Sequence, residues 1–251
     1  MEPSEFWSVG DYGVVGDLWS QPGRDLAESL DVQERDVIDL ATGTGVTAIA
    51  LAHAGARSVI GIDVTPVLLS EAARRAEAAA VTVEWIEADV MSIPLPTDSA
   101  DLVTSTFGIV FAADPKQALD EARRLTRPDG DIVFTSWSAA GLFGQVRRTL
   151  APYFPDAPEP WHETPGDITA MVGDDARVEE RTFNLTAASP EAFIDLLEQH
   201  SSPIVLATRT LGERWPQARK SLLDIVTEGG SYHDGVFRIS VPYLVTSLNV
   251  R

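Results

Sequence analysis

Cysteine is absent from this sequence of 251 residues. Disulfide bonds, thiolate nucleophiles and cysteine metal sites are therefore excluded. Lysine is almost absent, because Lys116 and Lys220 are the only lysines. With so little lysine, the sequence contains neither a phosphate-binding loop of the Gly-Lys-Ser kind nor the Tyr-x-x-x-Lys pair of short-chain dehydrogenases.

Long apolar runs are missing, and basic residues are few. No run reaches the roughly 18 apolar residues of a membrane span, so we expect no membrane insertion. The 38 acidic residues outnumber the 19 basic ones, and the net charge of −19 repels nucleic acid and anionic lipid. The acidic start, Met-Glu-Pro-Ser-Glu-Phe-Trp, is unlike a signal or transit peptide. We expect a cytoplasmic protein with a small-molecule substrate and no nucleic-acid partner, and the oligomeric state stays open.

The most informative motif that is present is Val-Ile-Asp-Leu-Ala-Thr-Gly-Thr-Gly at residues 37–45. Val37 and Ile38 are typical of a buried parallel strand, and the apolar segment 46–54 predicts a helix. Gly43 and Gly45 allow the backbone to come close to a ligand, and the helix start offers unpaired N–H donors. The pattern Gly-x-Gly-x-x-Ala also fits the dinucleotide sites of dehydrogenases, so a nicotinamide-dependent oxidoreductase is one alternative.

Three carboxylates follow three predicted strands. Asp39 ends the first strand, where a buried charge needs a partner such as a donor-rich ligand. Alternatively, Asp39 only accepts hydrogen bonds from the loop amides. Asp63 ends the next strand and could bridge two ribose hydroxyls or cap the helix that starts at Pro66. Asp89 follows the third strand, so all three carboxylates are expected at the edge where open parallel sheets bind ligands.

The hydrophobic pattern predicts an alternation of strands and helices along the chain. The expected strands cover 37–38, 58–62, 81–87, 101–106, 131–136, 177–186 and 236–248, and the expected helices cover 46–54, 115–127, 142–150, 190–199 and 213–227, with one more starting at 66. The proline-rich stretch 152–165 is predicted to be a surface loop.

These motifs together resemble those of the class I S-adenosylmethionine-dependent methyltransferases, in particular the ubiquinone and menaquinone biosynthesis type. The resemblance covers roughly residues 5–137. Its carriers are Asp-Leu-Ala-Thr-Gly-Thr-Gly at 39–45, Gly-Ile-Asp at 61–63, Glu-Ala-Asp-Val at 87–90, Asp-Leu-Val-Thr-Ser-Thr-Phe at 101–107 and Leu-Thr-Arg-Pro-Asp-Gly at 125–130. It implies an α/β fold with a Rossmann-like seven-stranded sheet, mostly parallel with an antiparallel last strand, flanked by helices and carrying a helical cover.

The resemblance also implies a domain plan. The chain is expected to be one methyltransferase domain over residues 1–251. Residues 1–137 would form the cofactor-binding core with an N-terminal lid. Residues 138–251 would form the substrate cover and the last two strands, whose two intervening helices would cover the methyl-donor pocket. S-adenosylmethionine would be the cofactor and S-adenosylhomocysteine the product.

The resemblance assigns roles to the cofactor residues one by one. Asp39 and the backbone of Ala41, Thr42 and Gly43 would surround the amino acid part of the cofactor. Asp63 would hold the ribose, and Val64 would pack on the adenine. Asp89 and the Val90 N–H would read the adenine edge, Thr106 would line the methionine end, and Tyr12 would touch the cofactor from the N-terminal segment. Ala41 replaces a common glycine, and we expect it to keep an ordinary backbone conformation.

The acceptor side is less defined. Phe107, Phe111, Trp137 and Trp161 are candidates for substrate contacts, with plain core packing as the alternative. Three histidines lie in the cover region, and each could act as a general base or be structural: His162, His200 and His233. His53 is expected to be structural. No catalytic residue is assigned, and no metal site is expected. The expected reaction is methyl transfer to O, N or C of a small molecule. A non-methylating S-adenosylmethionine-binding protein or a cyclase on the same fold is a second alternative.

Overall fold

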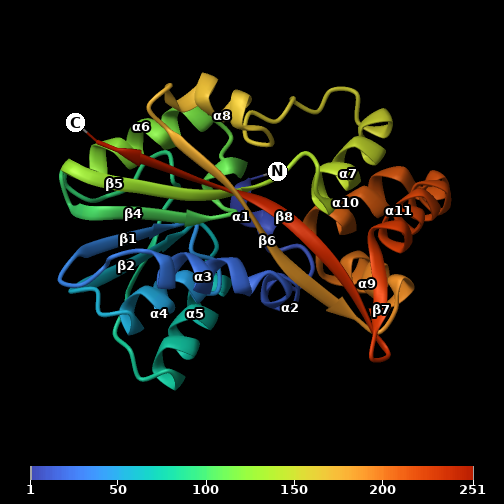
Figure 1. Ribbon diagram of the computed structural model, residues 1–251, viewed down its shortest axis with the longest axis horizontal. Coiled ribbons are helices and arrows are strands. Elements are labelled where there is room, and N and C mark those ends of the chain that lie inside the picture. The colour runs from blue at the N-terminus through green and yellow to red at the C-terminus, as the bar shows by residue number, and fades with distance from the viewer. Residues whose placement is uncertain (1, 251) are drawn as a thin grey trace.

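The computed structural model describes residues 2–250, which form a mixed β-sheet with helices on both faces (Figure 1). The strands are β1 (Asp36–Leu40), β2 (Ser58–Asp63), β3 (Glu84–Glu87), β4 (Ala100–Thr106), β5 (Thr126–Trp137), β6 (Arg177–Ala187), β7 (Gly230–His233) and β8 (Val236–Asn249). Their order across the sheet is β3-β2-β1-β4-β5-β8-β6, and β7 pairs with β8. The strands from β3 to β5 are parallel, whereas β8 is antiparallel to both β5 and β6.

All seven predicted strands are present, and the Rossmann-like arrangement with an antiparallel last strand is confirmed. Three details of the prediction were wrong. β5 begins at Thr126 rather than at Asp131. The third strand begins at Glu84 rather than at Val81, and an eighth strand, β7, forms a hairpin with β8. Asp234 and Gly235 make the turn of this hairpin, both with positive φ, as a tight hairpin turn requires.

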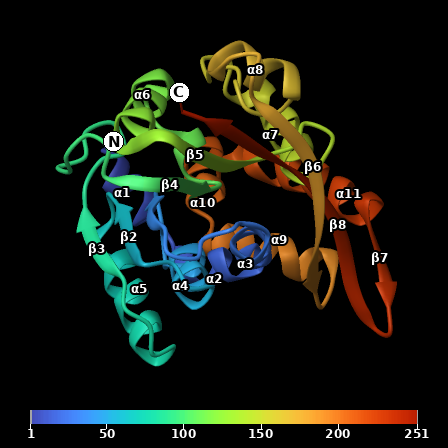
Figure 2. The ribbon, with the colours of Figure 1, turned by 60° about the vertical axis from the view of Figure 1, so that its left-hand side comes forward.

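The helices cover the two faces of the sheet unequally. They are α1 (Pro3–Trp7), α2 (Tyr12–Leu18), α3 (Ser20–Ser29), α4 (Val46–His53), α5 (Pro66–Ala78), α6 (Pro115–Leu125), α7 (Leu142–Leu150), α8 (Pro165–Val172), α9 (Pro190–His200), α10 (Ser202–Leu211) and α11 (Trp215–Gly229). Figures 1 and 2 show α3, α4 and α5 on one face and α6 and α8 on the other. Each face therefore buries its own hydrophobic core.

The predicted helices illustrate why these segments fold as they do. In α6 the apolar residues recur at helical spacing, so that Ala118, Leu119, Ala122 and Leu125 are all buried against the sheet. Asp114 caps this helix by accepting a hydrogen bond from the Gln117 N–H. The helices α1, α2, α3, α8 and α10 were not predicted. The first three are short or rich in glycine and proline, so tertiary packing stabilises them rather than helix propensity.

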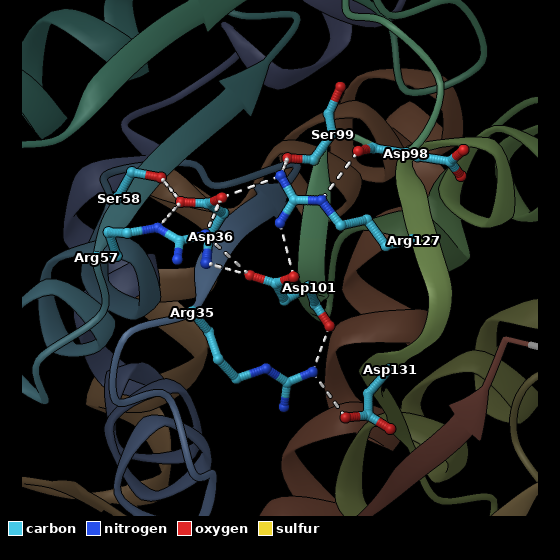
Figure 3. Close-up of polar contacts among 9 residues, drawn as sticks. All are labelled: Arg35, Asp36, Arg57, Ser58, Asp98, Ser99, Asp101, Arg127 and Asp131. Atoms are coloured by element: carbon cyan, nitrogen blue, oxygen red, sulfur yellow. Dashed lines mark hydrogen bonds and ion pairs between the residues drawn. The ribbon is translucent and has the colours of Figure 1, made fainter.

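At the amino ends of the strands, arginines and aspartates join neighbouring strands (Figure 3). The Arg57 Nε donates to Asp36 Oδ1 at 2.8 Å, and the Arg127 Nη1 donates to Asp101 Oδ1 at 2.6 Å. Hydrogen bonding from the Arg57 guanidinium, with further bonds from Ser58 and Arg127, holds the pKa of Asp36 far below its usual range. This cluster ties β1, β2, β4 and β5 together at one edge, which leaves the carboxyl edge open for a site.

None of the helices in residues 2–250 is long and apolar enough to cross a lipid bilayer.

Candidate active site

Two adjoining cavities lie at the carboxyl edge of the sheet. Their volumes are about 90 and 60 Å³. The residues that line both cavities are Tyr12, Ala41, Gly43, Thr106 and Phe107. The first cavity is further lined by Trp7, Asp63, Val64, Asp89, Val90 and Phe111, and the second by Asp39, Thr42 and Thr47. The structure thus brings the predicted cofactor residues together in one place.

The turn between β1 and α4 is built from left-handed backbone conformations. Ala41 has φ +49°, Gly43 +56° and Gly45 +80°. The expectation that Ala41 keeps an ordinary conformation was wrong, because the chain must reverse sharply here so that the Thr42 N–H can donate to the Ile62 carbonyl at 2.9 Å. For an alanine, this conformation carries a steric cost between Cβ and the backbone. The Ala41 methyl also fills the space in front of Gly108, where an added Cβ would lie 2.4 Å from it.

Asp39 is almost fully buried, with 1% of its surface exposed. Its carboxylate accepts hydrogen bonds from the Thr42 hydroxyl at 2.6 Å and the Thr104 hydroxyl at 2.8 Å. Its side-chain partners are therefore hydroxyls rather than the loop amides considered from the sequence. Burial raises the pKa of Asp39 to about 6, and the charge of Asp63 adds to the increase. A cationic group in the second cavity would favour the ionised form.

Asp63 is buried at the end of β2. Its two oxygens accept the Gly43 N–H at 2.8 Å and the Thr65 N–H at 2.9 Å. The side chain thus holds the glycine turn and the start of α5 at the same time, which supports the capping alternative without removing Asp63 from the cavity wall. Burial raises the pKa of Asp63, since desolvation outweighs these backbone hydrogen bonds.

Asp89, Val64 and Val90 form the far wall of the first cavity. The Asp89 carboxylate accepts the Met91 N–H at 2.9 Å and thereby fixes the turn after β3. Thr106, at the end of β4, faces both cavities, and its hydroxyl pairs with the Thr47 hydroxyl at 2.8 Å. The carboxyl ends of four strands therefore contribute to one site.

Tyr12 and Trp7 cover the site from the N-terminal segment. The Tyr12 ring lies 3.9 Å from where a Cβ on Gly43 would be, and the Trp19 Nε1 donates to its hydroxyl at 3.4 Å. Burial raises the pKa of the Tyr12 hydroxyl. Trp7 packs edge-to-face on Tyr12 and on Phe111, with ring centroids 5.4 and 5.5 Å apart. Trp7 was not singled out in the sequence, although the segment containing it was expected to cover the site.

The four aromatic candidates on the acceptor side divide into two pairs. Phe107 and Phe111 line the first cavity. Trp137 lies outside both linings, where it stacks on Phe107 with ring centroids 3.7 Å apart. Trp161 also lies outside them, with its ring 5.8 Å from that of Phe134. The structure therefore brings Phe107 and Phe111, but not Trp137 or Trp161, to the cavity wall.

The histidines have different surroundings. His162 is 7% exposed and packs against Phe111 with ring centroids 6.1 Å apart, and burial lowers its pKa. His200 ends α9, with its backbone against Gly10, and His233 is exposed in the β7 hairpin. His53 ends α4. Within residues 2–250, no group of three or more His, Asp or Glu side chains could hold a metal ion.

The helices between β6 and β8 have a different role from the expected one. We expected them to cover the methyl-donor pocket, yet none of the residues lining either cavity belongs to α9, α10 or α11. They support the N-terminal segment from behind, where the Ser202 hydroxyl donates to the Val9 carbonyl at 2.8 Å. Helix α2 bridges to α5 on its other side through the Arg75 Nη1 and Asp17 Oδ1, 2.6 Å apart.

Comparison with known proteins finds a methyltransferase domain in part of the chain. Residues 37–130 match the profile of the methyltransferase domain family. A demethylmenaquinone methyltransferase of Thermus thermophilus is 38% identical over 133 residues, which are 52% of this chain and 60% of that protein. An uncharacterized protein of Mycobacterium tuberculosis is 29% identical over 235 residues, 89% of this chain and 85% of that protein.

Solved structures agree on the fold. The YcgJ protein of Bacillus subtilis superposes with a TM-score of 0.63 at 18% identity, over 92% of this chain and 99% of that one. The [4+2]-cyclase SpnF superposes with a TM-score of 0.54 at 16% identity, over 92% of this chain and 81% of that one. The matched domain at residues 37–130 and the demethylmenaquinone methyltransferase relatives support a class I S-adenosylmethionine-dependent methyltransferase, and this family implies S-adenosylmethionine as the cofactor.

The residues at the carboxyl edge fit this cofactor. The left-handed turn at 41–45 and the buried carboxylate of Asp39 lie beside the cavities, and Asp89 stands there with the apolar Val64 and Val90. The cavities of about 90 and 60 Å³ are small beside the roughly 300 Å³ or more typical of ligand pockets. Trp7 and Tyr12 of the N-terminal segment form part of the wall of the first cavity.

Proposed function

We propose that the chain transfers a methyl group from S-adenosylmethionine to an O, N or C atom of a small, uncharged or weakly charged molecule. The observation that carries this proposal is the composition of the first cavity. Its charged lining residues are Asp63 and Asp89, both at strand ends, whereas Trp7, Phe107 and Phe111 line it with aromatic rings. Aromatic walls favour a flat, neutral acceptor.

The cofactor roles implied by the family resemblance are part of the proposal. Asp39 and the turn from Ala41 to Gly43 would surround the amino acid part, and Asp63 would hold the ribose. This assignment is supported by the positions of Asp39 and Asp63 in adjoining cavities that share the turn. Asp89, Val64 and Val90 would contact the adenine, while Thr106 and Tyr12 would contact the methionine end.

Methyl transfer from a sulfonium requires little chemical activation by the protein. The bound sulfonium supplies an activated methyl group, so the side chains have to position the acceptor and exclude water. Tyr12 and Trp7 are suited to exclude water because they cover the cavity. The net charge of −19 favours a small molecule over a nucleic acid as the acceptor. The domain plan, with a core at 1–137 and a substrate cover at 138–251, is proposed from the family resemblance alone, because no residue after 137 lines either cavity.

An untargeted transfer assay tests this function. The protein is incubated with S-adenosylmethionine labelled in the methyl group and a metabolite extract, and labelled products are identified by mass spectrometry. We expect a labelled product that is lost in Asp63→Ala. Calorimetry runs in parallel and should show heat for S-adenosylhomocysteine but not for NAD. Tight NAD binding would contradict the proposal that S-adenosylmethionine is the cofactor.

The alternative of a non-methylating protein is tested in the same experiment. One structural neighbour is a [4+2]-cyclase, so the fold alone does not guarantee methyl transfer. Binding of S-adenosylhomocysteine without any labelled product across extracts would favour this alternative.

A further inference from the structure

A short piece of chain joins the two aromatic residues that close the first cavity at the N-terminal side. Trp7 is the last residue of α1 and Tyr12 the first residue of α2. We name the residues between them, 8–11, the strap. The Trp7 and Tyr12 side chains both line the first cavity, and their rings pack edge-to-face with centroids 5.4 Å apart. The position of the strap therefore sets the position of both rings.

The strap is fastened to the corner between α9 and α10 at two adjacent residues. The Ser202 hydroxyl donates to the Val9 carbonyl at 2.8 Å, and Ser202 is fully buried. Gly10 lies directly on the backbone of His200, because an added Cβ would lie 2.6 Å from the His200 carbonyl oxygen. Gly10 also has φ +79°, in the left-handed region. A side chain at this position is therefore disfavoured twice, by its own backbone and by that of α9.

The corner that holds the strap is itself well ordered by hydrogen bonds. The Ser201 N–H donates to the Leu197 carbonyl at 2.9 Å, and the Ser201 carbonyl accepts the Val205 N–H at 2.8 Å. Helical hydrogen bonding thus continues from α9 into α10. Helix α2 lies beside α9 (Figure 2), and its Val15 is fully buried in the core cluster that also contains Leu197. The strap therefore rests on a part of the protein that the core holds in place.

The corner has no contact of its own with the site. No residue of α9 or α10 lines either cavity at the carboxyl edge, and neither do Val9 and Gly10. A serine hydroxyl has one hydrogen to donate, and Ser202 donates it to the strap. Any effect of this corner on a bound molecule must therefore pass through Trp7 and Tyr12.

A wall that is already in place favours binding. A ligand that has to order a loose segment loses affinity, because the entropy cost of ordering is subtracted from the binding free energy. The hydrogen bond to Val9 and the contact at Gly10 order the strap before any ligand arrives. Without them, part of the binding free energy would be used to bring Trp7 and Tyr12 to the cavity.

We propose that Ser202 and Gly10 are positioning residues of the enzyme, which fix the strap so that Trp7 and Tyr12 are in place at the wall of the cofactor cavity. This inference rests on the proposed binding of S-adenosylmethionine at this site. It gives the corner between α9 and α10 a role in ligand binding, although none of its residues lines either cavity.

Two glycines with the same backbone angle provide a matched test. Gly10 and Gly235 both have φ +79°, but a Cβ on Gly235, in the hairpin turn, would meet nothing within 4 Å. Alanine at either position carries the same left-handed strain, and only Gly10→Ala also presses on His200. Gly10→Ala should weaken binding of S-adenosylhomocysteine at least about tenfold, in line with the usual cost of overpacking, whereas Gly235→Ala should stay within about twofold of the wild type.

Two serines of the same helical unit provide a second pair. Ser202 holds the strap, whereas Ser189 caps the other end of α9 by accepting the Ala192 N–H at 3.1 Å. Both Ser202→Ala and Ser189→Ala remove one hydrogen bond, so both should lower Tm. Only Ser202→Ala should weaken binding of S-adenosylhomocysteine, by at least about threefold, which is within the range of one net hydrogen bond. Calorimetry well below the Tm of every variant measures the affinities.

A resonance in the wall separates positioning from stability. The Trp7 indole N–H signal, assigned with Trp7→Phe, should shift in ligand-free Gly10→Ala and Ser202→Ala. It should keep its wild-type position in Gly235→Ala and Ser189→Ala, although these variants also lose stability. If Gly10→Ala does not fold, Ser202→Ala and its control carry the test.

The contrary outcomes are distinct. Wild-type affinity in Ser202→Ala or in folded Gly10→Ala overturns the inference. It is also overturned if the controls lose as much affinity as their partners, or if the Trp7 signal stays in place. If the wild type itself does not bind S-adenosylhomocysteine, the proposed function fails, and this result comes from the wild type rather than from any variant.

Discussion

Replacing Ala41 by glycine should stabilise the protein. Ala41 has φ +49°, in the left-handed region where an L side chain meets its own backbone. Glycine has no Cβ and adopts this conformation freely. The substitution removes the strain while it leaves the hydrogen bond from the Thr42 N–H to the Ile62 carbonyl in place.

The expected magnitude follows from two opposing contributions. The left-handed conformation costs a non-glycine residue roughly 1 to 2 kcal/mol. Glycine makes the unfolded chain more flexible, which removes about 0.4 to 1 kcal/mol of that gain. Loss of the methyl that faces Gly108 reduces it slightly further. The unfolding free energy should therefore rise by roughly 0.5 to 1 kcal/mol, and Tm by about 1 to 4 °C.

Urea and thermal denaturation of the ligand-free protein measure this change, with two matched controls. Ala80 follows α5 with φ +55° and lies away from the cavities, so Ala80→Gly should stabilise to a similar extent. Ala48 is fully buried inside α4, so Ala48→Gly should destabilise by about 1 kcal/mol. If Ala41→Gly lowered stability as Ala48→Gly does, the strain argument at this turn would be refuted.

Three further predictions concern the carboxylates and the cover. Burial raises the pKa of Asp39 from 3.8 to about 6, so the folded state loses stability as pH rises between these values; Asp39→Asn should therefore raise the unfolding free energy by up to about 3 kcal/mol at pH 7, and the gain should vanish below about pH 4. A gain that is independent of pH would exclude this cause. Asp63→Ala should weaken binding of S-adenosylhomocysteine by roughly 2 to 3 kcal/mol. It should also lower Tm, because two backbone N–H groups, one of them from Gly43, lose their acceptor; calorimetry and melting curves check both effects, and an affinity within about twofold of the wild type would make Asp63 a structural residue only. Hydrogen exchange should show that S-adenosylhomocysteine protects residues 6–12 and 152–165, and unchanged exchange in both segments would mean a site that is open without a lid.

Much of the fold could be predicted because its signals are local. β1 and β2 are apolar runs that end in carboxylates, and α6 carries its apolar residues at helical spacing between an aspartate cap and the next strand. Parallel strands have their carboxyl ends at one edge, so Asp39, Asp63 and Asp89 could be placed together before any contact was known. The cavities confirm that these residues share one edge of the sheet.

Other features could not be read from the sequence, because they depend on which surfaces meet. The N-terminal helices are too short to form alone and are held by contacts with α5, α9 and α10 that lie far away in the chain. Trp137 and Trp161 looked equal to Phe107 and Phe111 as pocket residues. Only tertiary packing decides that the phenylalanines face the cavity while Trp137 stacks on Phe107.

The sequence by itself determined the strand and helix order and the chemistry at the strand ends, because both depend on residue type and short-range spacing. Tertiary structure alone decided the backbone conformation of Ala41, since it follows from docking the turn onto β2. It also decided that His162 is buried against Phe111 while His233 is exposed. Burial depends on neighbours distant in the chain, and no local pattern encodes them.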